Sequence, residues 1–512
     1  MGSGFRATAF FYSPRPYFEP LLYFAAKRNH YMSYRLVSIL IFCSGFAACD
    51  AGRTLTVQQA AQPAKLPSGA PRHSDVCFSS RWERPRNTED SLETFQAARS
   101  FHATYLNWVY TTNPNFIKKA DSLGYRLQVA LTPSLPDLPL GSSTNEKGRI
   151  LNKSGQKVTA PWMKGWNNWW GCVNNPDFQD SYFAHMEAAI LAGAYGFQVD
   201  DPAMGFLLLR NKWEDVCYCD FCQKKADSLG MPPTDIQEVS VKDFHRKMKK
   251  MAEKLAGREV PFSCNNFEGD WELFPFGEFD FGVAEIPERR ANPEFIYATI
   301  REASRLGKAQ VFTFSNDRDW LVQKMIAATY ACGGNMLVPW DVWQGGGKER
   351  YFGKPEQFAP IYGFVRATAK WLDGYEDAFY STSQDEPRFV ETEKLPVSFD
   401  DYRRQVHAFV RAKPRDNSAP VVVHLIDWHV LMEPFGLRLN ERRFFKKGIA
   451  SIQLLTPASY DELLHQKAEA SGNFSNLVAS QTLDFQRDDK MLQLKIPKLE
   501  NHWGILIVTP KT

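Results

Sequence analysis

The stretch DSYFAHMEAAILAGAYGFQVDD (residues 180–201) combines the two elements from which the fold is built. Its first part is a helical run that ends in Gly193, a residue typical of helix C-termini. Its second part, AYGFQVDD, is a short apolar run that ends in Asp200 and Asp201, and it predicts a buried strand. A helix that leads directly into a buried strand indicates a parallel sheet with helical crossovers.

The same alternation extends from residue 73 to about residue 375 and predicts eight strands. These are DVCFSSRW (75–82), ATYLNWVY (103–110), YRLQVALTP (125–133), AYGFQVDD (194–201), VPFSCNNF (260–267), FDFGVAEIP (279–287), AQVFTFSND (309–317) and NMLVPWDVW (335–343). Helical runs separate most of them, and only the step from the fifth to the sixth strand lacks a clear helix. Eight such units predict a (β/α)8 TIM barrel over residues 73–385. A doubly wound open sheet is the alternative, but no glycine-rich nucleotide fingerprint follows the first strand.

The last part of the chain, residues 386–512, has a different pattern. Short apolar runs such as APVVVHLIDW and HWGILIVTP are separated by turn residues, which predicts an antiparallel β-sandwich. Few residues suited to catalysis cluster there. We therefore interpret it as an accessory domain that packs on the barrel.

Residues 32–49 have the pattern of an export signal. A positively charged start leads into an apolar run of signal-peptide length, and small residues precede Cys49 as in a bacterial lipobox. This predicts a lipoprotein that is exported and anchored to a membrane through Cys49, in the periplasm or at the cell surface. Residues 1–31 are interpreted as a mis-called extension and residues 50–72, rich in Ala, Gln and Pro, as a linker. No other segment is long and apolar enough to cross a membrane.

Composition narrows the class of partner. The 512 residues carry a net charge of +3, so charge alone indicates no polyanion, and we expect no nucleic-acid partner. Aromatic residues reach 14% of the chain and include 14 Trp. Exposed aromatic rings are a common platform for stacking sugar rings, although core packing explains most of them.

The predicted strand ends suggest the chemistry, because active sites of such barrels lie at the C-terminal ends of the strands. They carry acids, amides and tryptophans: Arg81, Trp82, Asn107, Trp108, Thr132, Asp200, Asp201, Asn265, Asn266, Glu285, Ser315, Asn316, Trp340, Asp341 and Trp343. No strand end offers His, and no Ser–His–Asp order is present. Cleavage of a glycosidic bond needs two carboxylates, hydrogen bonds to hydroxyl groups and a stacking surface.

The strand-four acids and Glu285 on strand six are the best catalytic pair. Either Asp200 or Asp201 is expected to act as nucleophile, with Glu285 as the acid/base residue. The structural alternative pairs Glu285 with Arg289 or Arg290. The reserve candidates are Glu268, Asp270 and Asp341.

The loop PWMKGWNNWWGC (161–172) holds four tryptophans, which favours sugar-binding subsites over a small satellite core. The expected substrate contacts are Trp82, Asn107, Trp108, Trp166, Trp169, Trp170, Asn265, Asn266, Trp340, Asp341 and Trp343. A basic group near the same edge has two interpretations, contact with sulfate or carboxylate groups of an acidic glycan or ordinary solvated charge. Its members are Arg289, Arg290, Lys348 and Arg350.

Four of the nine cysteines form a distinct pattern. Cys172 precedes strand four, and Cys217, Cys219 and Cys222 follow it in CYCDFC. Four thiolates with this spacing are typical of a closed, tetrahedral zinc site. Disulfides are the alternative for an exported protein, but cysteines one residue apart rarely bridge each other. We expect structural zinc and no organic cofactor. The buried free thiols are expected to be Cys77, Cys264 and Cys332.

The runs Cys172-Val-Asn-Asn-Pro176 and Cys217-Tyr-Cys-Asp-Phe-Cys222 resemble those of the family-42 β-galactosidases. The resemblance implies a barrel glycoside hydrolase with zinc bound by the four cysteines, and it covers residues 165–230. Pro202 stands where that family has its acid/base Glu, and the seventh strand ends without the family's nucleophilic Glu. The family's catalytic pair is therefore not transferred to this chain.

Together these patterns predict an exported glycoside hydrolase that acts on a poly- or oligosaccharide, neutral or acidic, with retention of configuration. One alternative is a surface glycan-binding barrel that does not cleave. Another is a polysaccharide lyase, which usually needs Tyr, His or Lys as its base.

Overall fold

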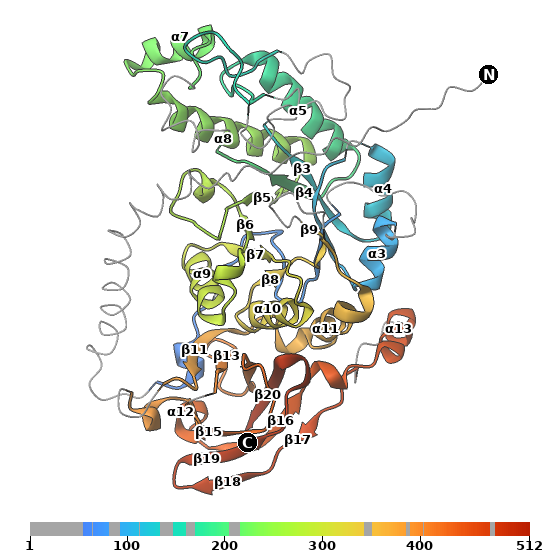
Figure 1. Cartoon of the computed structure of the whole chain (residues 1–512), viewed down its shortest axis with the longest axis vertical. Coiled ribbons are helices and arrows are strands. Elements are labelled where there is room, and N and C mark those ends of the chain that lie inside the picture. Colours follow the sequence, from blue (N-terminus) through green and yellow to red (C-terminus); the bar gives the residue numbers. More distant parts are fainter. Residues whose placement is uncertain are drawn as a thin grey trace, which may run out of the picture. The chain divides into compact units, whose positions relative to one another are not determined.

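Eight parallel strands pair in chain order from β1 to β8, as the sequence predicts (Figure 1). They are β1 (Cys77–Phe78), β2 (Tyr105–Val109), β3 (Arg126–Leu131), β4 (Gly196–Val199), β5 (Phe262–Asn265), β6 (Phe281–Glu285), β7 (Ala309–Thr313) and β8 (Asn335–Met336). A parallel bridge from Cys77 to Leu337 joins the first and last strands, so the sheet closes. This confirms the TIM barrel.

This computed structural model describes residues 55–63, 65–80, 93–111, 113–133, 147–159, 169–203, 216–342, 351–385, 390–402, 404–471 and 477–512. Residues 1–54, which hold the predicted extension, signal peptide and Cys49, lie outside the described ranges. Among the residues within them, no helix has both the length and the apolar character needed to span a membrane.

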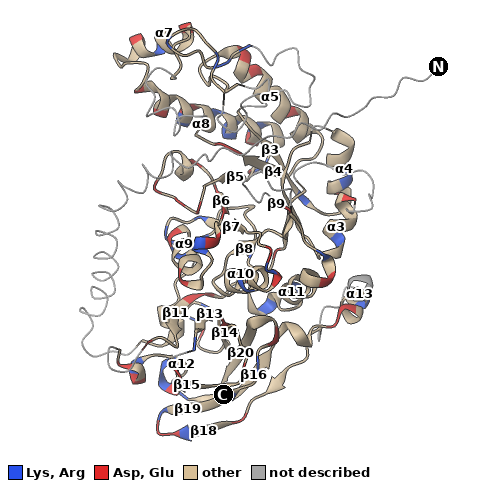
Figure 2. Ribbon diagram, in the orientation of Figure 1, with Lys and Arg blue, Asp and Glu red and all other residues tan. Residues whose placement is uncertain are grey.

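Helices separate the strands. The principal ones are α3 (Thr94–Ser100), α4 (Pro114–Ser122), α5 (Pro176–Leu191), α7 (Asp220–Leu229), α8 (Ile236–Ala256), α9 (Pro293–Arg305), α10 (Asp319–Ala331) and α11 (Pro355–Ala367). Between β5 and β6 the chain makes only the 3-10 turn η3 (Phe276–Glu278), where the sequence also lacks a helical run. Lys and Arg share helices such as α8 and α9 with Asp and Glu (Figure 2).

The helix before β4 shows how local sequence fixes an element. The side chain of Asn175 caps α5 by accepting a hydrogen bond from the backbone N–H of Asp177, and a proline opens the first turn. Phe178, Tyr182 and Met186 follow at four-residue spacing and are buried where α5 packs on α8. The helix thereby places Cys172 before β4 and delivers the chain to the acidic strand end.

The last predicted strand, residues 335–343, divides into two elements. β8 ends at Met336, and β9 (Trp340–Val342) instead pairs antiparallel with β10 (Tyr351–Phe352). Pro339 lies between them, and a proline has no N–H with which to continue a ladder.

The C-terminal region is an antiparallel β-sandwich, as predicted. One sheet has the order β11-β13-β14-β20-β16-β17 and the other β12-β15-β19-β18. Its strands are β11 (Glu376–Thr382), β12 (Val397–Phe399), β13 (Val406–Ala412), β14 (Val421–Asp427), β15 (Phe435–Asn440), β16 (Ile449–Leu455), β17 (Gln481–Thr482), β18 (Phe485–Asp488), β19 (Met491–Ile496) and β20 (Trp503–Pro510). The first sheet thus begins at Glu376, before the predicted boundary at residue 386.

Part of the predicted linker, residues 50–72, is folded onto the sandwich. Helix α2 (Val57–Ala60) lies there, and Val57 and Ala61 are each only 2% exposed in the core of the sandwich. The sandwich in turn contacts the barrel through buried basic residues. Arg411 on β13 donates to the carbonyl oxygen of Cys332 at 2.8 Å, and Lys324 on α10 donates to that of Trp428 at 2.8 Å.

Candidate active site

Asp200 follows β4, and its carboxyl group accepts three hydrogen bonds. The hydroxyl of Tyr110 donates to its Oδ2 at 2.5 Å. The Nδ2 of Asn265 donates to its Oδ1 at 3.3 Å, and the backbone N–H of Asp201 donates to the same oxygen at 3.2 Å. Donors from the ends of β2 and β5 therefore fix the orientation of a carboxyl group at the end of β4.

Tyr110 also belongs to this group of side chains, although the strand-end prediction does not include it. It directly follows β2, and its hydroxyl accepts a hydrogen bond from the indole N–H of Trp108 at 3.3 Å while it donates to Asp200. Trp108 itself is buried in the barrel interior. The available signal was a tyrosine at the C-terminal end of a predicted strand.

Asp201 lies against the other two acids. Burial of its carboxyl group raises its pKa well above the usual range, and the negative charges of Asp200 and Glu285 raise the pKa further. The three carboxyl groups predicted from strands four and six are thus close enough to interact electrostatically. The arrangement favours a protonated Asp201 beside two other acids.

Glu285 is the last residue of β6 and is partly exposed. Its backbone N–H donates to the carbonyl oxygen of Phe267 at 2.7 Å, which joins the ends of β5 and β6. The arginines named in the structural alternative are engaged elsewhere. Both Arg289 and Arg290 form ion pairs with Glu268, the latter at 3.3 Å.

Two of the reserve candidates, Glu268 and Asp270, have structural partners. The pairing of Glu268 with two arginines occupies its carboxylate and also engages half of the predicted basic group. Asp270 accepts hydrogen bonds from the backbone N–H groups of Glu272 and Leu273, which shapes the turn after β5.

Several strand ends have a backbone in the left-handed region. The φ angle is +57° at Trp108, +48° at Asp201, +54° at Phe267 and +53° at Asp341. Residues other than glycine rarely adopt this backbone region, and those that do are concentrated at functional sites. The strain therefore coincides with the edge of the barrel that carries the acids.

Three predicted substrate contacts are packed in the interior. Asn107 is buried and donates to Gln128 at 2.7 Å. Asn266 exchanges hydrogen bonds with Gln310 at 3.0 and 3.2 Å. Trp340 is 3% exposed and packs against other aromatic rings. These side chains hold the barrel together and are not at an open surface.

The remaining predicted contacts are distributed differently. Asn265 is bonded to Asp200, and Asp341 is fully buried on β9. Trp170 is 1% exposed and belongs to the small core around the cysteines, while Trp169 is partly exposed beneath the ammonium group of Lys157. The predicted residues outside the described ranges are Arg81, Trp82, Trp162, Trp166, Trp343, Lys348 and Arg350.

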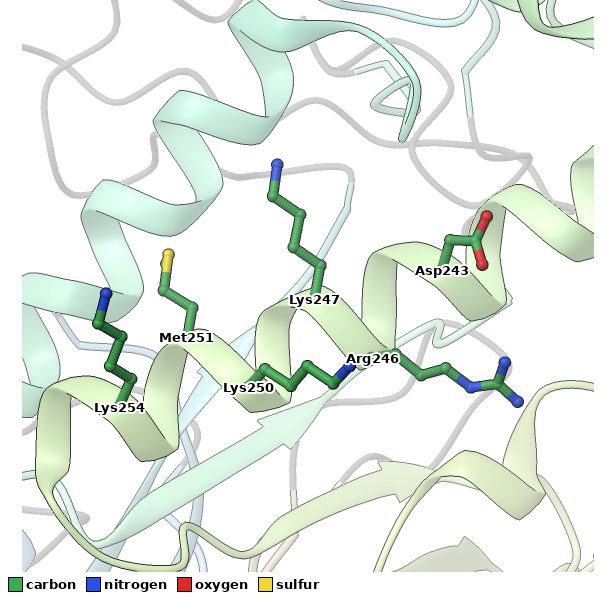
Figure 3. A pocket seen from close by; sticks show the side chains of 6 residues that line it. All are labelled: Asp243, Arg246, Lys247, Lys250, Met251 and Lys254. Atoms are coloured by element: carbon green, nitrogen blue, oxygen red, sulfur yellow. The ribbon is translucent and has the colours of Figure 1, made fainter. Parts of the chain in front are cut away.

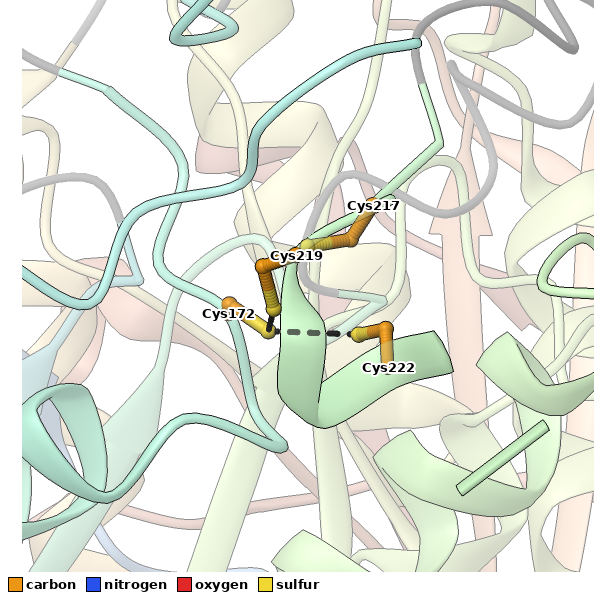
Figure 4. Close-up of side chains that lie close together, drawn as sticks. All are labelled: Cys172, Cys217, Cys219 and Cys222. Atoms are coloured by element: carbon orange, nitrogen blue, oxygen red, sulfur yellow. Dashed lines mark hydrogen bonds between the residues drawn. The ribbon is translucent and has the colours of Figure 1, made fainter. Parts of the chain in front are cut away.

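The four predicted zinc ligands converge in one buried cluster (Figure 4). Their sulfur atoms all lie within 4.8 Å of one another, with Cys172 at 3.4 Å from Cys222 and 3.6 Å from Cys219. Sulfurs about 2.3 Å from a tetrahedral zinc ion would be about 3.8 Å apart. The described cysteines form no disulfide. The donor set therefore fits a metal ion.

The surroundings of this cluster also suit thiolates. Cys219 is the N-cap of α7 and Cys222 lies in its first turn, where the helix dipole favours negative charge. The amide of Asn174 donates to the sulfur of Cys222 at 3.3 Å. Such outer contacts commonly orient metal ligands.

A hollow of about 520 Å³ lies along α8 (Figure 3). It is lined by Asp243, Arg246, Lys247, Lys250, Met251 and Lys254. Three of these bind nearby groups, since Arg246 pairs with Glu278, Lys247 donates to Gln179 and Asp243 pairs with Lys225. All the lining residues belong to one outer helix, so the hollow contains none of the strand-end acids.

No family model and no curated protein matches the sequence. The barrel and sandwich are similar to solved structures at low identity. A debranching enzyme of Nostoc punctiforme has a TM-score of 0.46 and 8% identity, and the match covers 88% of this chain and 100% of that one. An alpha-amylase from Lactobacillus plantarum has a TM-score of 0.47 and 8% identity over 85% and 99% of the two chains. A family-27 β-L-arabinopyranosidase of Geobacillus stearothermophilus has a TM-score of 0.41 and 9% identity, and the match covers 90% of this chain and 100% of that one.

These identities and TM-scores are too low to assign an activity. The resemblance of the cysteine region to the family-42 β-galactosidases stays a prediction.

Proposed function

We propose that the protein is a glycoside hydrolase whose catalytic groups are Asp200 and Glu285. One observation supports this most: the carboxyl groups of Asp200 and Glu285 both lie close enough to that of Asp201 to raise its pKa, at the C-terminal edge of a TIM barrel. Glycosidic cleavage needs two carboxyl groups in different environments. Here one is fixed by several donors and one lies at the open end of β6.

Asp200 suits the role of nucleophile. Its oxygens are oriented by Tyr110 and Asn265, so the carboxylate reaches the anomeric carbon without a loss of side-chain freedom. Glu285 would protonate the leaving oxygen as acid and then, as base, activate the water that releases the sugar. This sequence retains the anomeric configuration.

Asp201 is proposed to stay protonated next to this pair. Burial and the negative charges of Asp200 and Glu285 both disfavour a third negative charge there. A neutral Asp201 also offers a hydrogen-bond donor to a sugar hydroxyl or to a neighbouring carboxylate.

The test is the release of new reducing ends from a panel of soluble polysaccharides, neutral and acidic. We expect cleavage of at least one polysaccharide, and NMR should show that the products retain the anomeric configuration. Binding of a polysaccharide without the release of new reducing ends would instead support a glycan-binding protein.

The lyase alternative has a candidate base in Tyr110, whose hydroxyl donates a hydrogen bond to the carboxylate of Asp200. A lyase breaks the bond by removing a proton next to a uronic carboxylate and leaves an unsaturated sugar. Ultraviolet absorption of the products separates the two reactions. The glycoside hydrolase is preferred because three acids, Asp200, Asp201 and Glu285, gather at the site.

The four cysteines are proposed to hold structural zinc through Cys172, Cys217, Cys219 and Cys222. When bound, the ion would tie the segment before α5 to the start of α7 and would take no part in the reaction. Metal analysis of the purified protein tests this directly.

The protein is also proposed to be an exported lipoprotein, which rests on the sequence pattern of residues 32–49. Metabolic labelling with a radioactive fatty acid should mark the wild-type protein and not the Cys49→Ala variant.

A further inference from the structure

Two tryptophans from different domains lie close to one buried lysine. Trp320, in the first turn of α10, is 41% exposed, and Trp428, directly after β14, is partly exposed. The ammonium group of Lys324 lies 4.8 Å from the ring centre of Trp320 and 5.5 Å from that of Trp428. Both indoles therefore lie at the contact between barrel and sandwich, each next to the same ammonium group.

Lys324 fixes this arrangement. Its side chain is 1% exposed, and its ammonium group donates to the carbonyl oxygens of Trp428 and His429 at 2.8 and 3.0 Å. Burial lowers its pKa to about 8. A buried lysine that bonds two consecutive carbonyl groups holds the loop after β14 against α10.

The loop continues as an exposed apolar surface. Val430 is 73% exposed and Leu431 is 63% exposed, next to Trp428 in the chain. Single exposed apolar residues are common, but adjoining ones at a domain contact mark interaction sites. We call Trp320, Trp428, Val430 and Leu431 the aromatic rim.

A run of polar side chains joins the aromatic rim to the proposed catalytic edge. Glu285 pairs in register with Thr313, the last residue of β7. Shortly after each strand, Asn316 donates to Glu288 at 2.8 Å and Arg318 bonds both of these side chains. The guanidinium of Arg318 lies 5.3 Å from the ring centre of Trp320.

Along this path, polar side chains that donate and accept hydrogen bonds lead to the exposed aromatic rings. That combination suits a chain of sugars, in which hydroxyl groups accept and donate hydrogen bonds while the C–H faces of the rings stack on indole. A membrane surface would be matched by free cations around the apolar residues, whereas Arg318 is paired with Glu288.

We infer that the aromatic rim binds distal sugar units of the same glycan that reaches Asp200 and Glu285. The sandwich is then part of the binding surface. The ligand class rests on the proposed function, while the location rests on the exposed rings and their connection to β6 and β7. It follows that long chains should bind more tightly than short ones.

The experiment uses the full chain in native affinity gels that contain soluble starch, xylan, galactomannan or pectic galactan. The variant Trp320→Ala removes the ring, and Trp320→Phe keeps an aromatic face. The matched control is Leu191→Ala, which removes another exposed apolar side chain, 71% exposed at the end of α5. For each glycan that retards the protein, kcat/KM is also compared for its disaccharide and its hexasaccharide.

We expect Trp320→Ala to weaken retention on the order of tenfold, Trp320→Phe to restore most of it, and Leu191→Ala to match wild type. If a glycan is cleaved, the loss in kcat/KM should fall on the hexasaccharide and not on the disaccharide. Retention that depends on Trp320 without any cleavage would support this inference and refute the hydrolase. Unchanged retention in Trp320→Ala, or no retention of the wild type by any of the four glycans, would overturn the inference.

Discussion

The cysteine cluster and the carboxyl cluster both gather ionisable side chains around β4, but they differ in what surrounds them. The four sulfurs face one another in a small core of their own and are buried. In the carboxyl cluster, Asp200 instead accepts hydrogen bonds from residues at the ends of other strands, Tyr110 and Asn265. Four buried sulfur ligands that face one another suit a structural metal ion. Carboxyl groups in different environments at the strand ends suit acid/base catalysis.

This contrast divides the consequences of substitution. Changes in the carboxyl cluster should alter turnover and leave the fold intact. Changes in the cysteine cluster should alter stability and metal content, with turnover affected only through unfolding.

The largest expected effect is on turnover. Glu285→Gln should lower kcat by a factor on the order of 10³, because the leaving oxygen loses its proton donor. Reducing-end release from a cleaved polysaccharide gives the rate, and circular dichroism checks the fold. Glu278→Gln is the matched control, since Glu278 forms an ion pair with Arg246 on an outer helix. Full turnover by Glu285→Gln would remove it from the mechanism.

The next largest effect is on stability. Cys219→Ser should lose bound zinc and destabilise the protein by more than about 2 kcal/mol, because one of four ligands is gone. Urea unfolding and elemental analysis measure both. The control Cys264→Ala removes a buried thiol on β5 outside the cluster and should keep the zinc. Equal zinc content in wild type and Cys219→Ser would show that these cysteines bind no zinc.

A smaller loss of turnover is expected at Tyr110. Tyr110→Phe removes the hydroxyl that orients Asp200, so kcat should fall about tenfold to a hundredfold, with a stability change on the order of 1 kcal/mol. Tyr195→Phe is the control, because Tyr195 lies just before β4, at the opposite end of that strand. If the two variants had the same kcat, Tyr110 would be no more than a packing residue.

The smallest effect separates Asp201 from its neighbours. Its folded-state pKa lies above that of an exposed aspartate, so the native protein binds a proton there that the unfolded chain has lost. Wild-type stability therefore declines as pH rises from about 4 through the folded-state pKa. Asp201→Asn should not show this decline, and its advantage in urea unfolding should grow with pH.

The control variant, Asp416→Asn, is expected to show the opposite change of stability with pH. Hydrogen bonds from the hydroxyl and backbone of Ser418 lower the pKa of Asp416, so Asp416→Asn should cost stability near neutral pH and lose that cost in acid. An advantage of Asp201→Asn that shrinks as pH rises would contradict the raised pKa.

Much of the fold follows from the sequence because each barrel strand is a short apolar run bounded by helical runs. The exception lies at residues 335–343, where a continuous apolar run is divided at Pro339. The sequence shows the apolar run itself. Whether the parallel pairing continues past Pro339 depends on where the neighbouring strand of the sheet ends, which the sequence does not show.

The candidate site is predictable only in part. The positions of Asp200, Asp201 and Glu285 at strand ends follow from the apolar runs before them, and the grouping of the four cysteines follows from their spacing. Trp340 and Asn107 also stand near strand ends, yet the structure buries them, because a barrel strand alternates between faces that are both covered. Which face a residue takes depends on local twist and on left-handed positions such as Trp108.

The most direct test of the carboxyl cluster is chemical rescue with azide. Replacement of Asp200 by glycine should abolish turnover on a cleaved glycan, and azide should restore it by attacking the anomeric carbon in place of the missing carboxylate while Glu285 protonates the leaving oxygen. We expect a glycosyl azide of inverted configuration from Asp200→Gly and none from Asp201→Gly. Rescue of Asp201→Gly alone would assign the nucleophile to Asp201, and rescue of neither, with turnover intact in both, would contradict catalysis at this site.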